Sequence, residues 1–200
     1  MKILRTEGGL LHPDILKNPE NVICLQSNCV ATKIHSESIN DLLWRALGFG
    51  NPYEDRRPKP SHQMGWKHRR RNLALPEDRP RMGTIKVFQD DKKKCGLVCL
   101  FAQYNMGSGK HFYFSDKEYI DACHEFDGAN PSLNRLKAFS KCLNELSSSP
   151  QIVSFKNVLF PYKIGCSRAG GNWSDYLRTL QMFDKSNHNL IVYIVIPSQA

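Results

Sequence analysis

The residues best suited to chemistry lie in a loop with three glycines, between a short apolar run and a predicted helix. The apolar run is 158–160, and the loop holds Gly165, Gly170 and Gly171. Glycine allows positive φ and lets the backbone approach a ligand without a Cβ in the way. A strand, a glycine loop and a helix start present N–H groups and a positive dipole end to a phosphate. The loop predicts phosphate binding, and the alternative is a tight turn between a core strand and a core helix.

The helix after this loop can be capped by Asn172 or Ser174, since either side chain can accept a hydrogen bond from the first turn. Its apolar residues recur with the helical period; they are Tyr176, Leu177, Leu180 and Phe183. Inside the loop, Arg168 can pair with a phosphate oxygen, or it is a solvated surface arginine. Cys166 beside the glycines suggests a nucleophile, but the sequence places no partner His and acid with it.

A second polar group follows a predicted buried strand at 21–26. That strand ends in Gln26, Ser27 and Asn28, and polar residues at the carboxyl ends of strands contact ligands in open α/β sheets. Asn28 can instead serve as a strand-end cap or turn residue. His35 can act as an acid or base near physiological pH; the alternative is an ordinary surface histidine.

Other segments must position these loops. Apolar and alternating patterns predict strands at 2–5, 84–89, 96–102 and 190–196, the last one fully buried. Ser36 or Ser38 can cap one helix, and Ser132 can cap another. Their predicted apolar positions are Ile39, Leu42, Leu43 and Leu47 in the first and Leu133, Leu136, Phe139, Leu143 and Leu146 in the second. Strands alternating with helices predict a single α/β domain with a sheet covered on both faces.

Two segments lack periodicity. Residues 51–82 are rich in Pro and Arg and predict a long surface loop or partly ordered insertion, and 103–131 predicts an irregular loop. Because Tyr53 and Trp66 lie among the charges of this region, a basic arm at 56–81 can bind RNA or another anion. The alternative is a solvated loop held by prolines and by Arg–carboxylate pairs.

Composition favours an anionic partner. The chain has 28 Lys and Arg against 19 Asp and Glu, a formal net charge of +9, which suits a phosphorylated ligand or a nucleic acid. Seven cysteines without paired spacing indicate reduced thiols and no zinc site. With no signal peptide and no apolar run of membrane-spanning length, we expect an intracellular protein, cytoplasmic or nuclear. We also expect a monomer that needs no membrane, metal or cofactor.

Several stretches share features with one known family. Residues 160–166 and 170–173 read Phe-Pro-Tyr-Lys-Ile-Gly-Cys and Gly-Gly-Asn-Trp, and residues 23–29 read Ile-Cys-Leu-Gln-Ser-Asn-Cys. Gly-Gly-Leu-Leu stands at 8–11. Together they resemble the macro domains, which bind ADP-ribose. Residues 71–79 and 83–85 also look like a phage- and virus-type subgroup of macro-like proteins.

The resemblance implies a three-layer α/β/α fold with a mixed central sheet and an ADP-ribose site at the carboxyl ends of the strands. In the family, the residue matching Asn28 contacts the distal ribose, and the glycine loop wraps the diphosphate. Implied catalysis uses Asn28 to position a water, with His35 or a substrate phosphate helping. The implied ligand-binding residues are Gln26, Ser27, Asn28, Lys33, Ile164, Gly165, Cys166, Ser167, Arg168, Ala169, Gly170, Gly171 and Asn172.

The chain departs from the family at three places. Gly9 stands where the family has an adenine-binding Asp, and 30–36 contains no glycine where the family has a glycine-rich phosphate loop. Lys33 and His35 can supply charge there instead. Ala169 stands where one branch has an Asp, so the lysine-adduct mechanism of that branch is not expected.

Three function hypotheses follow. The preferred one is a macro-like hydrolase that acts on ADP-ribosyl linkages or on a phosphate of ADP-ribose, such as ADP-ribose 1''-phosphate. The second is a non-catalytic module that binds ADP-ribose or an ADP-ribosylated macromolecule. The third is an RNA-binding protein that uses the basic arm.

Overall fold

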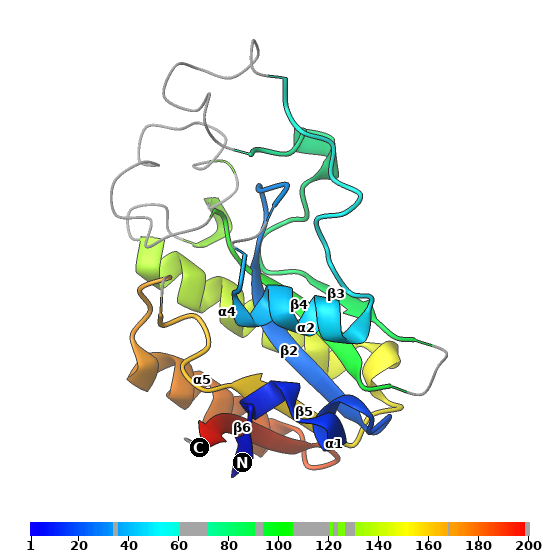
Figure 1. The fold of residues 1–200 in the computed structure, drawn as a ribbon. Helices are drawn as coiled ribbons and strands as arrows, with labels where there is room; N and C mark the ends of the chain where they lie inside the picture. Colours follow the sequence, from blue (N-terminus) through cyan, green and yellow to red (C-terminus); the bar gives the residue numbers. More distant parts are fainter. Residues whose placement is uncertain are drawn as a thin grey trace.

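A computed structural model describes residues 1–33, 36–60, 72–90, 94–105, 121, 124–126, 131–167 and 169–198. Within these ranges the backbone forms a six-stranded sheet with helices on both faces (Figure 1). The strands are β1 (Lys2–Glu7), β2 (Asn21–Asn28), β3 (Ile85–Phe88), β4 (Gly96–Gln103), β5 (Asn157–Pro161) and β6 (Ile191–Ser198). Their order is β1-β6-β5-β2-β4-β3, and all neighbours are parallel except β3, which is antiparallel to β4.

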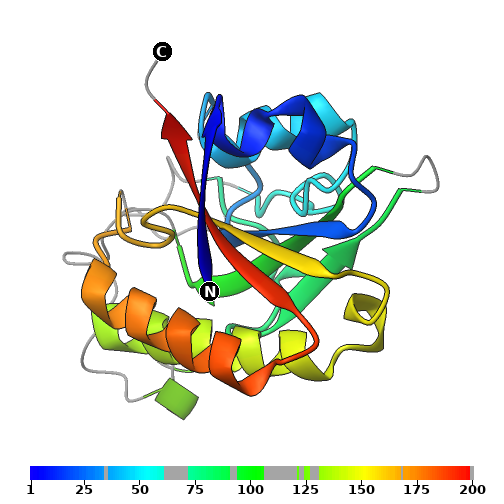
Figure 2. The same cartoon turned by 90° about the horizontal axis from the view of Figure 1, so that it is seen from below.

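The helices form two layers. They are α1 (Pro13–Leu16), α2 (Ile39–Leu47), α4 (Pro131–Ser148) and α5 (Trp173–Ser186), with 3-10 turns η1 (Gly9–Leu11), η4 (Pro76–Asp78), η5 (His124–Phe126) and η6 (Pro150–Ile152). Figure 2 shows α1 and α2 on one face of the sheet and α4 and α5 on the other. The predicted three-layer α/β/α fold with a mixed sheet is therefore confirmed. Across the described ranges, no helix combines the length and the apolar character needed to cross a membrane.

The centre of the sheet consists of β2 and β4, which pair in parallel. Residues 22–25 of β2 are 0% exposed, and all of β4 is buried. Both strands are continuous apolar runs, as expected for strands covered on both faces. Cys24 and Cys99 serve here as small apolar side chains, and burial raises the pKa of the Cys99 thiol to about 12.

The buried face of α2 differs from the predicted one. Ser38 is the cap, as one of the two alternatives had it. Leu43 and Leu47 are buried as predicted, but Ile39 and Leu42 are 37% and 36% exposed. Trp44 lies on the buried face instead, because its ring packs edge-on against the Tyr53 ring with centroids 5.6 Å apart. The inward face of α2 is thus set by a partner outside the helix.

The first turn of α4 buries polar rather than apolar side chains. Leu133 was predicted to face the core, but it is 37% exposed. Asn134 and Arg135 are 0% and 5% exposed in its place. Further along, Phe139, Leu143 and Leu146 are buried as predicted. The helix therefore has an apolar half against the sheet and a polar start near the strand ends.

Strand β6 is only partly buried, although 190–196 was predicted to be a fully buried strand. Val192, Ile194 and Val195 are at most 3% exposed, whereas Ile191 is 39% exposed. The reason is that β6 lies next to the edge strand β1, where the helical layers cover the sheet less completely. Ile3 of β1 is 65% exposed.

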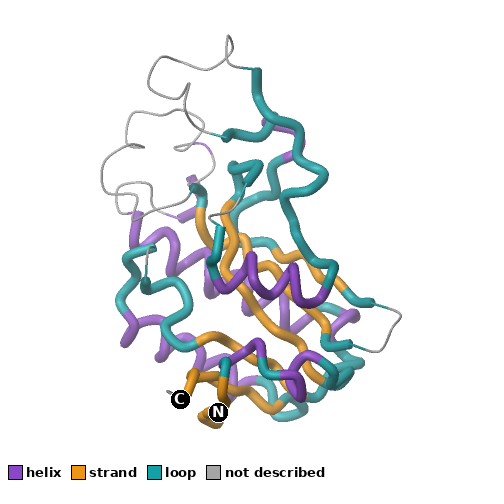
Figure 3. The backbone as a smooth tube through the Cα atoms, in the orientation of Figure 1, coloured by secondary structure: helices purple, strands orange, loops and turns teal. Residues whose placement is uncertain are grey.

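The described ends of the 51–82 segment, which was predicted to be a long surface loop or partly ordered insertion, pack in part against the body. Its buried residues include Pro52, Tyr53, Arg56, Ala74 and Met82. An isolated bridge pairs Pro58 with Ala74, so the two ends run alongside each other as loops (Figure 3). Residues 61–71, with Trp66 and the basic run 67–71, lie outside the described residues, as does most of 103–131.

Candidate functional site

The connections after β2 and β5 leave the sheet on opposite faces, although these strands are neighbours. β2 pairs in parallel with β5, with Ile23 opposite Leu159. After β2 the chain passes to α2 on one face, and after β5 it passes to α5 on the other (Figures 1 and 2). This is a topological switch point, where open α/β sheets bind ligands. We call the two connections the first loop (28–33) and the glycine loop (162–172).

The glycine loop is held by its own backbone hydrogen bonds. Gly171 N donates to Gly165 O at 3.0 Å, and Gly170 N donates to Ser167 O at 3.1 Å. Gly165 and Gly170 have φ of 72° and 73°, a conformation that residues with a Cβ seldom adopt. These hydrogen bonds and backbone conformations define the shape of the loop.

The glycine loop lies directly on the ring of Tyr176. A Cβ on Gly165 would be 2.5 Å from Tyr176 Cε1, and one on Gly171 would be 2.7 Å from Tyr176 Cε2. Tyr176 is 1% exposed and packs against Phe139 with ring centroids 4.8 Å apart. Packing thus explains Gly165 and Gly171. Gly170 is exposed and is the glycine at which the backbone faces solvent.

The glycine loop ends at the capped N-terminus of a long helix. Asn172 caps α5, and its Oδ1 accepts hydrogen bonds from Ser174 N at 2.9 Å and Ser174 Oγ at 2.6 Å. The sequence had left Asn172 and Ser174 as alternatives, and the structure assigns the cap to Asn172. Since α5 is 14 residues long, its N-terminus carries the positive end of a full helix dipole.

A buried arginine that sequence analysis missed ties the glycine loop to the end of β4. Arg135 Nη1 donates to Ala169 O at 2.5 Å, and Nη2 donates to Asn105 O at 3.3 Å. The guanidinium comes from the polar start of α4 and places a positive charge beneath the loop. In the sequence, the one feature that could have indicated this role is that an arginine occurs on the inward side of a predicted amphipathic helix.

Two buried polar atoms lie beneath the glycine loop. Gln26 Nε2 donates to Gln103 Oε1 at 3.3 Å, which leaves Gln26 Oε1 near Gly165 and the Tyr176 ring. Among the described residues, Gln26 Oε1 and the Tyr176 hydroxyl are buried without a hydrogen bond of good geometry. Burial raises the pKa of the Tyr176 phenol, so it is a neutral donor at physiological pH. The Gln26 side chain interacts with the phenol and opposes this rise in pKa, so each of the two polar groups has the other as a neighbour beneath the loop.

Asn28 has a structural role in the first loop. It is 4% exposed, its Nδ2 donates to the Tyr53 hydroxyl at 3.0 Å, and its Oδ1 accepts from Ala31 N at 2.8 Å. The backbone N–H of Asn28 also donates to Tyr53, at 3.0 Å. The carboxamide is held inside the protein, which corresponds to the strand-end role that was the alternative to ribose contact.

The backbone N–H groups of residues 28–32 in the first loop are all used within the protein. Besides the bonds from Asn28 and Ala31, Cys29 N and Val30 N donate to Tyr104 O at 3.1 and 3.2 Å, and Thr32 N donates to Asn72 O at 2.9 Å. Residues 28–32 therefore offer no N–H group to a phosphate. This agrees with the absence of glycine at 30–36.

Arg56 holds the carbonyl groups of the first loop. Its Nη1 donates to Ala31 O at 2.7 Å, Cys29 O at 3.0 Å and Asn28 O at 3.2 Å, and Nη2 donates to Asn28 O at 3.2 Å. The side chain is 7% exposed and lies 4.4 Å from the centroid of the Tyr53 ring. Burial lowers its pKa. Arg56 is thus an internal clamp and not part of an exposed basic arm.

The other described arginines of the predicted arm also bond within the protein. Arg57 pairs with Asp78 at 2.7 Å, and Arg81 pairs with Glu125 at 2.7 Å. Arg79 Nε donates to a backbone carbonyl at 2.9 Å. These contacts match the alternative in which Arg–carboxylate pairs tie the segment down.

The remaining predicted site residues are spread between surface and core. Ser27 and Ile164 are buried, Cys166 and Ala169 are half-buried, and Lys33 and Ser167 are exposed. His35 and Arg168 lie outside the described residues. The structure therefore brings Gln26, the glycine loop and Asn172 together, while Asn28 and Ser27 lie within the fold.

Cys166 is expected to react slowly with alkylating agents. Its Sγ donates to Ile164 O at 3.2 Å, and burial raises the pKa of the thiol to about 11. Since the thiolate is the reactive form, alkylation by iodoacetamide at pH 8 should be slower than for a free cysteine. The rate should keep rising with pH beyond 9, as followed on the Cys166 peptide by mass spectrometry. A rate that levels off below pH 8 would contradict this and would revive the nucleophile hypothesis.

Comparison with known proteins supports the fold. No protein-family model and no curated protein sequence matches the chain. A solved structure of a protein of unknown function from Bacteroides thetaiotaomicron is similar, with 17% sequence identity over 99% of this chain and 99% of that chain. The TM-score is 0.57. At this level of identity the similarity concerns the fold alone.

Proposed function

We propose that the protein binds a ligand of the ADP-ribose class at the switch point, with the diphosphate on the glycine loop. The observation that carries this proposal is the conformation of Gly170, which is exposed and left-handed at the N-terminus of α5. Packing against Tyr176 accounts for the other two glycines of the loop, whereas Gly170 stands in an exposed turn closed by the hydrogen bond from its N–H to Ser167 O. Exposed backbone at the start of a helix is suited to a phosphate.

The charges around the glycine loop support an anionic ligand. Arg135 lies beneath Ala169, and Lys163 and Lys33 are exposed on the two connections. Gln26 and the Tyr176 hydroxyl offer neutral polar groups below the loop. The resemblance of 160–166 and 170–173 to the macro-domain loop narrows the ligand to ADP-ribose. Gly9 in place of the family's Asp leaves the diphosphate and distal ribose as the main contacts.

The geometry supports ADP-ribose binding more strongly than it supports hydrolysis of ADP-ribosyl linkages. Of the two residues predicted to act in catalysis, Asn28 holds the first loop through Tyr53 and Ala31, and His35 lies outside the described residues. The Cys166 thiol is protonated at physiological pH because burial raises its pKa. Recognition is therefore the proposed activity. Hydrolysis stays a prediction, to be measured as turnover of ADP-ribosylated protein.

A glutamate at Gly170 should strongly weaken ADP-ribose binding. The change adds a negative side chain where the diphosphate is expected and places a Cβ at a φ of 73°. Calorimetric titration should show micromolar binding to the unmodified protein. In Gly170→Glu the affinity should be at least about tenfold weaker, because like charges repel at short range.

Gly48→Glu is the matched control. Gly48 is also exposed and left-handed, with φ of 78° and no atom within 4 Å of an added Cβ. It lies at the opposite end of α2 from the first loop, so this variant should bind ADP-ribose like the unmodified protein. Equal binding by Gly170→Glu, or equal loss in both variants, would speak against the glycine loop as the phosphate site.

A further inference from the structure

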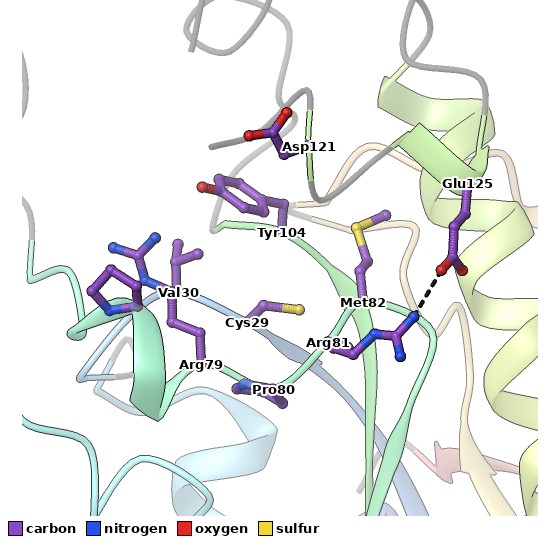
Figure 4. Close-up of a pocket in the computed structure, with 10 residues that line it drawn as sticks. Cys29, Val30, Arg79, Pro80, Arg81, Met82, Tyr104, Asp121 and Glu125 are labelled. Atoms are coloured by element: carbon purple, nitrogen blue, oxygen red, sulfur yellow. Dashed lines mark hydrogen bonds and ion pairs between the residues drawn. The ribbon is translucent and has the colours of Figure 1, made fainter. Parts of the chain in front are cut away.

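A cavity of about 410 Å³ lies between the first loop, the segment that leads into β3 and the side chains of Tyr104, Asp121 and Glu125 (Figure 4). Its volume is in the range of small-molecule sites. The residues that shape its centre are Val30, Met82 and Tyr104, which are 1%, 5% and 7% exposed. The centre is therefore apolar and includes one aromatic ring.

Charged side chains stand at the two ends of this cavity. Figure 4 shows Arg79 on one side of the apolar centre and the Arg81–Glu125 pair on the other. Asp121 lies beside Tyr104 in the same view. The cavity thus has an apolar middle, guanidinium groups as planar donors at both ends and carboxylates as acceptors. Such a pattern suits a flat ring with polar edges and an attached anion.

One wall of the cavity is fixed by the fold. Ala74 N donates to Val30 O at 2.7 Å, and Gly83 N donates to Phe101 O at 2.8 Å. Arg79 Nε donates to Ala74 O at 2.9 Å. The segment that carries Arg79 and Met82 is therefore hydrogen-bonded to the first loop at one end and to β4 at the other. A ligand would meet a preformed surface on this side of the cavity, which lowers the entropic cost of binding.

We propose that this cavity binds the base and phosphate of a nucleotide. The base would stack on Tyr104 between Val30 and Met82, since aromatic stacking is the general means of holding an exposed base. The Asp121 carboxylate would accept hydrogen bonds from amino groups on the base edge, since the two Glu125 oxygens already accept from Arg81 and Lys141. Arg79 or Arg81 would pair with the phosphate.

Other ligand classes fit the cavity less well. A purely apolar ligand would make no use of the charged groups at the two ends of the cavity, and a free phosphate would leave the Tyr104 wall unused. A metal ion is not favoured, because no group of three His, Cys, Asp or Glu side chains is found among the described residues. The net charge of +9 agrees with an anionic partner. A nucleotide uses all parts of the site.

Titrations with AMP and CMP test this proposal, with ribose 5-phosphate as the ligand that lacks a base. Both nucleotides should bind, and ribose 5-phosphate should bind at least about tenfold more weakly because it cannot stack. Tyr104→Leu should weaken AMP binding about tenfold, while Tyr104→Phe should keep it. Thermal melts of both variants show whether they remain folded. Equal affinity for AMP and ribose 5-phosphate would overturn the proposal.

Two variants, each of which replaces an arginine with the neutral glutamine, test the phosphate contact. Arg81→Gln should weaken AMP binding about fivefold at low salt. Arg45→Gln is its match, since both arginines are exposed and each pairs with a carboxylate at 2.7 Å. Arg45 is on α2, so its variant should bind AMP normally. Equal effects in the two would mean that net charge alone is responsible, against the proposed site.

Further measurements distinguish this cavity from the switch point, and nucleic acid from free nucleotides as the ligand. In Gly170→Glu, AMP binding should persist; loss there together with normal binding in Tyr104→Leu would place the base at the switch point and overturn the proposal. A ten-nucleotide RNA that binds more tightly than AMP, and that Tyr104→Leu weakens, assigns the site to nucleic acid. Equal affinities assign it to free nucleotides.

Discussion

Replacing Arg56 with methionine should lower the free energy of unfolding by about 3 to 5 kcal/mol. The buried guanidinium makes four hydrogen bonds to the carbonyls of Asn28, Cys29 and Ala31. Methionine fills part of the space but leaves these carbonyls without a donor inside the protein, and each unsatisfied buried group is costly. Urea unfolding, followed by circular dichroism, measures the change.

The neighbouring Arg57 provides the control for this measurement. It is exposed and pairs with Asp78, and exposed ion pairs contribute little to stability. Arg57→Met removes the same charge from the next position in the chain and should leave the unfolding midpoint nearly unchanged. If both variants lost the same stability, Arg56 would not be the clamp described here. A smaller loss in Arg56→Lys would show how much depends on the planar fork.

Replacing Gly165 with alanine should remove ADP-ribose binding and cost about 3 kcal/mol of stability. The new Cβ would lie 2.5 Å from Gln26 Oε1 and 2.5 Å from Tyr176 Cε1. The φ of 72° adds strain for any residue with a Cβ. Since Gly165 O accepts the hydrogen bond from Gly171 N, displacement of Gly165 would open the whole loop. Unfolding and calorimetric titration measure the two effects.

Gly48→Ala separates backbone strain from crowding. Its φ is 78°, and no atom lies within 4 Å of an added Cβ. It should cost only about 1 kcal/mol, the strain of the left-handed conformation, and should leave ligand binding intact. A similar stability loss in Gly165→Ala and Gly48→Ala would mean that crowding against Tyr176 adds nothing to the cost of the Gly165→Ala substitution.

The sequence predicts those parts of the fold that depend on local pattern. The continuous apolar runs of β2 and β4 identify the central strands, because strands buried on both faces need no polar alternation. The succession of β5, the glycine loop and the start of α5 is also predicted from local residue types. Asn172 is one of the two helix caps that the sequence offers there. The face that a helix buries is less certain: Trp44 is turned inward by Tyr53, nine positions further along the chain.

The parts that the sequence does not predict depend on partners far apart in the chain. Arg56 lies in a polar, proline-rich stretch that has the pattern of a surface loop, but its acceptors are 25 to 28 residues away. Arg135 is 34 residues from Ala169. Asn28 lies at the end of a strand, where ligand-binding residues are expected. Only the position of Tyr53 shows that its amide already makes a hydrogen bond within the protein. Such contacts arise from tertiary packing and have no local signal.

The most direct test of the central claim is an NMR titration of ¹⁵N-labelled protein with ADP-ribose. Binding at the switch point predicts that the amide signals of Gly165, Gly170, Gly171 and Trp173 shift together and saturate at one affinity. Signals of Gly48 and Arg57 should stay in place. Shifts confined to Val30, Arg81, Met82 and Tyr104, or no shifts at all, would contradict the claim that the glycine loop holds the diphosphate.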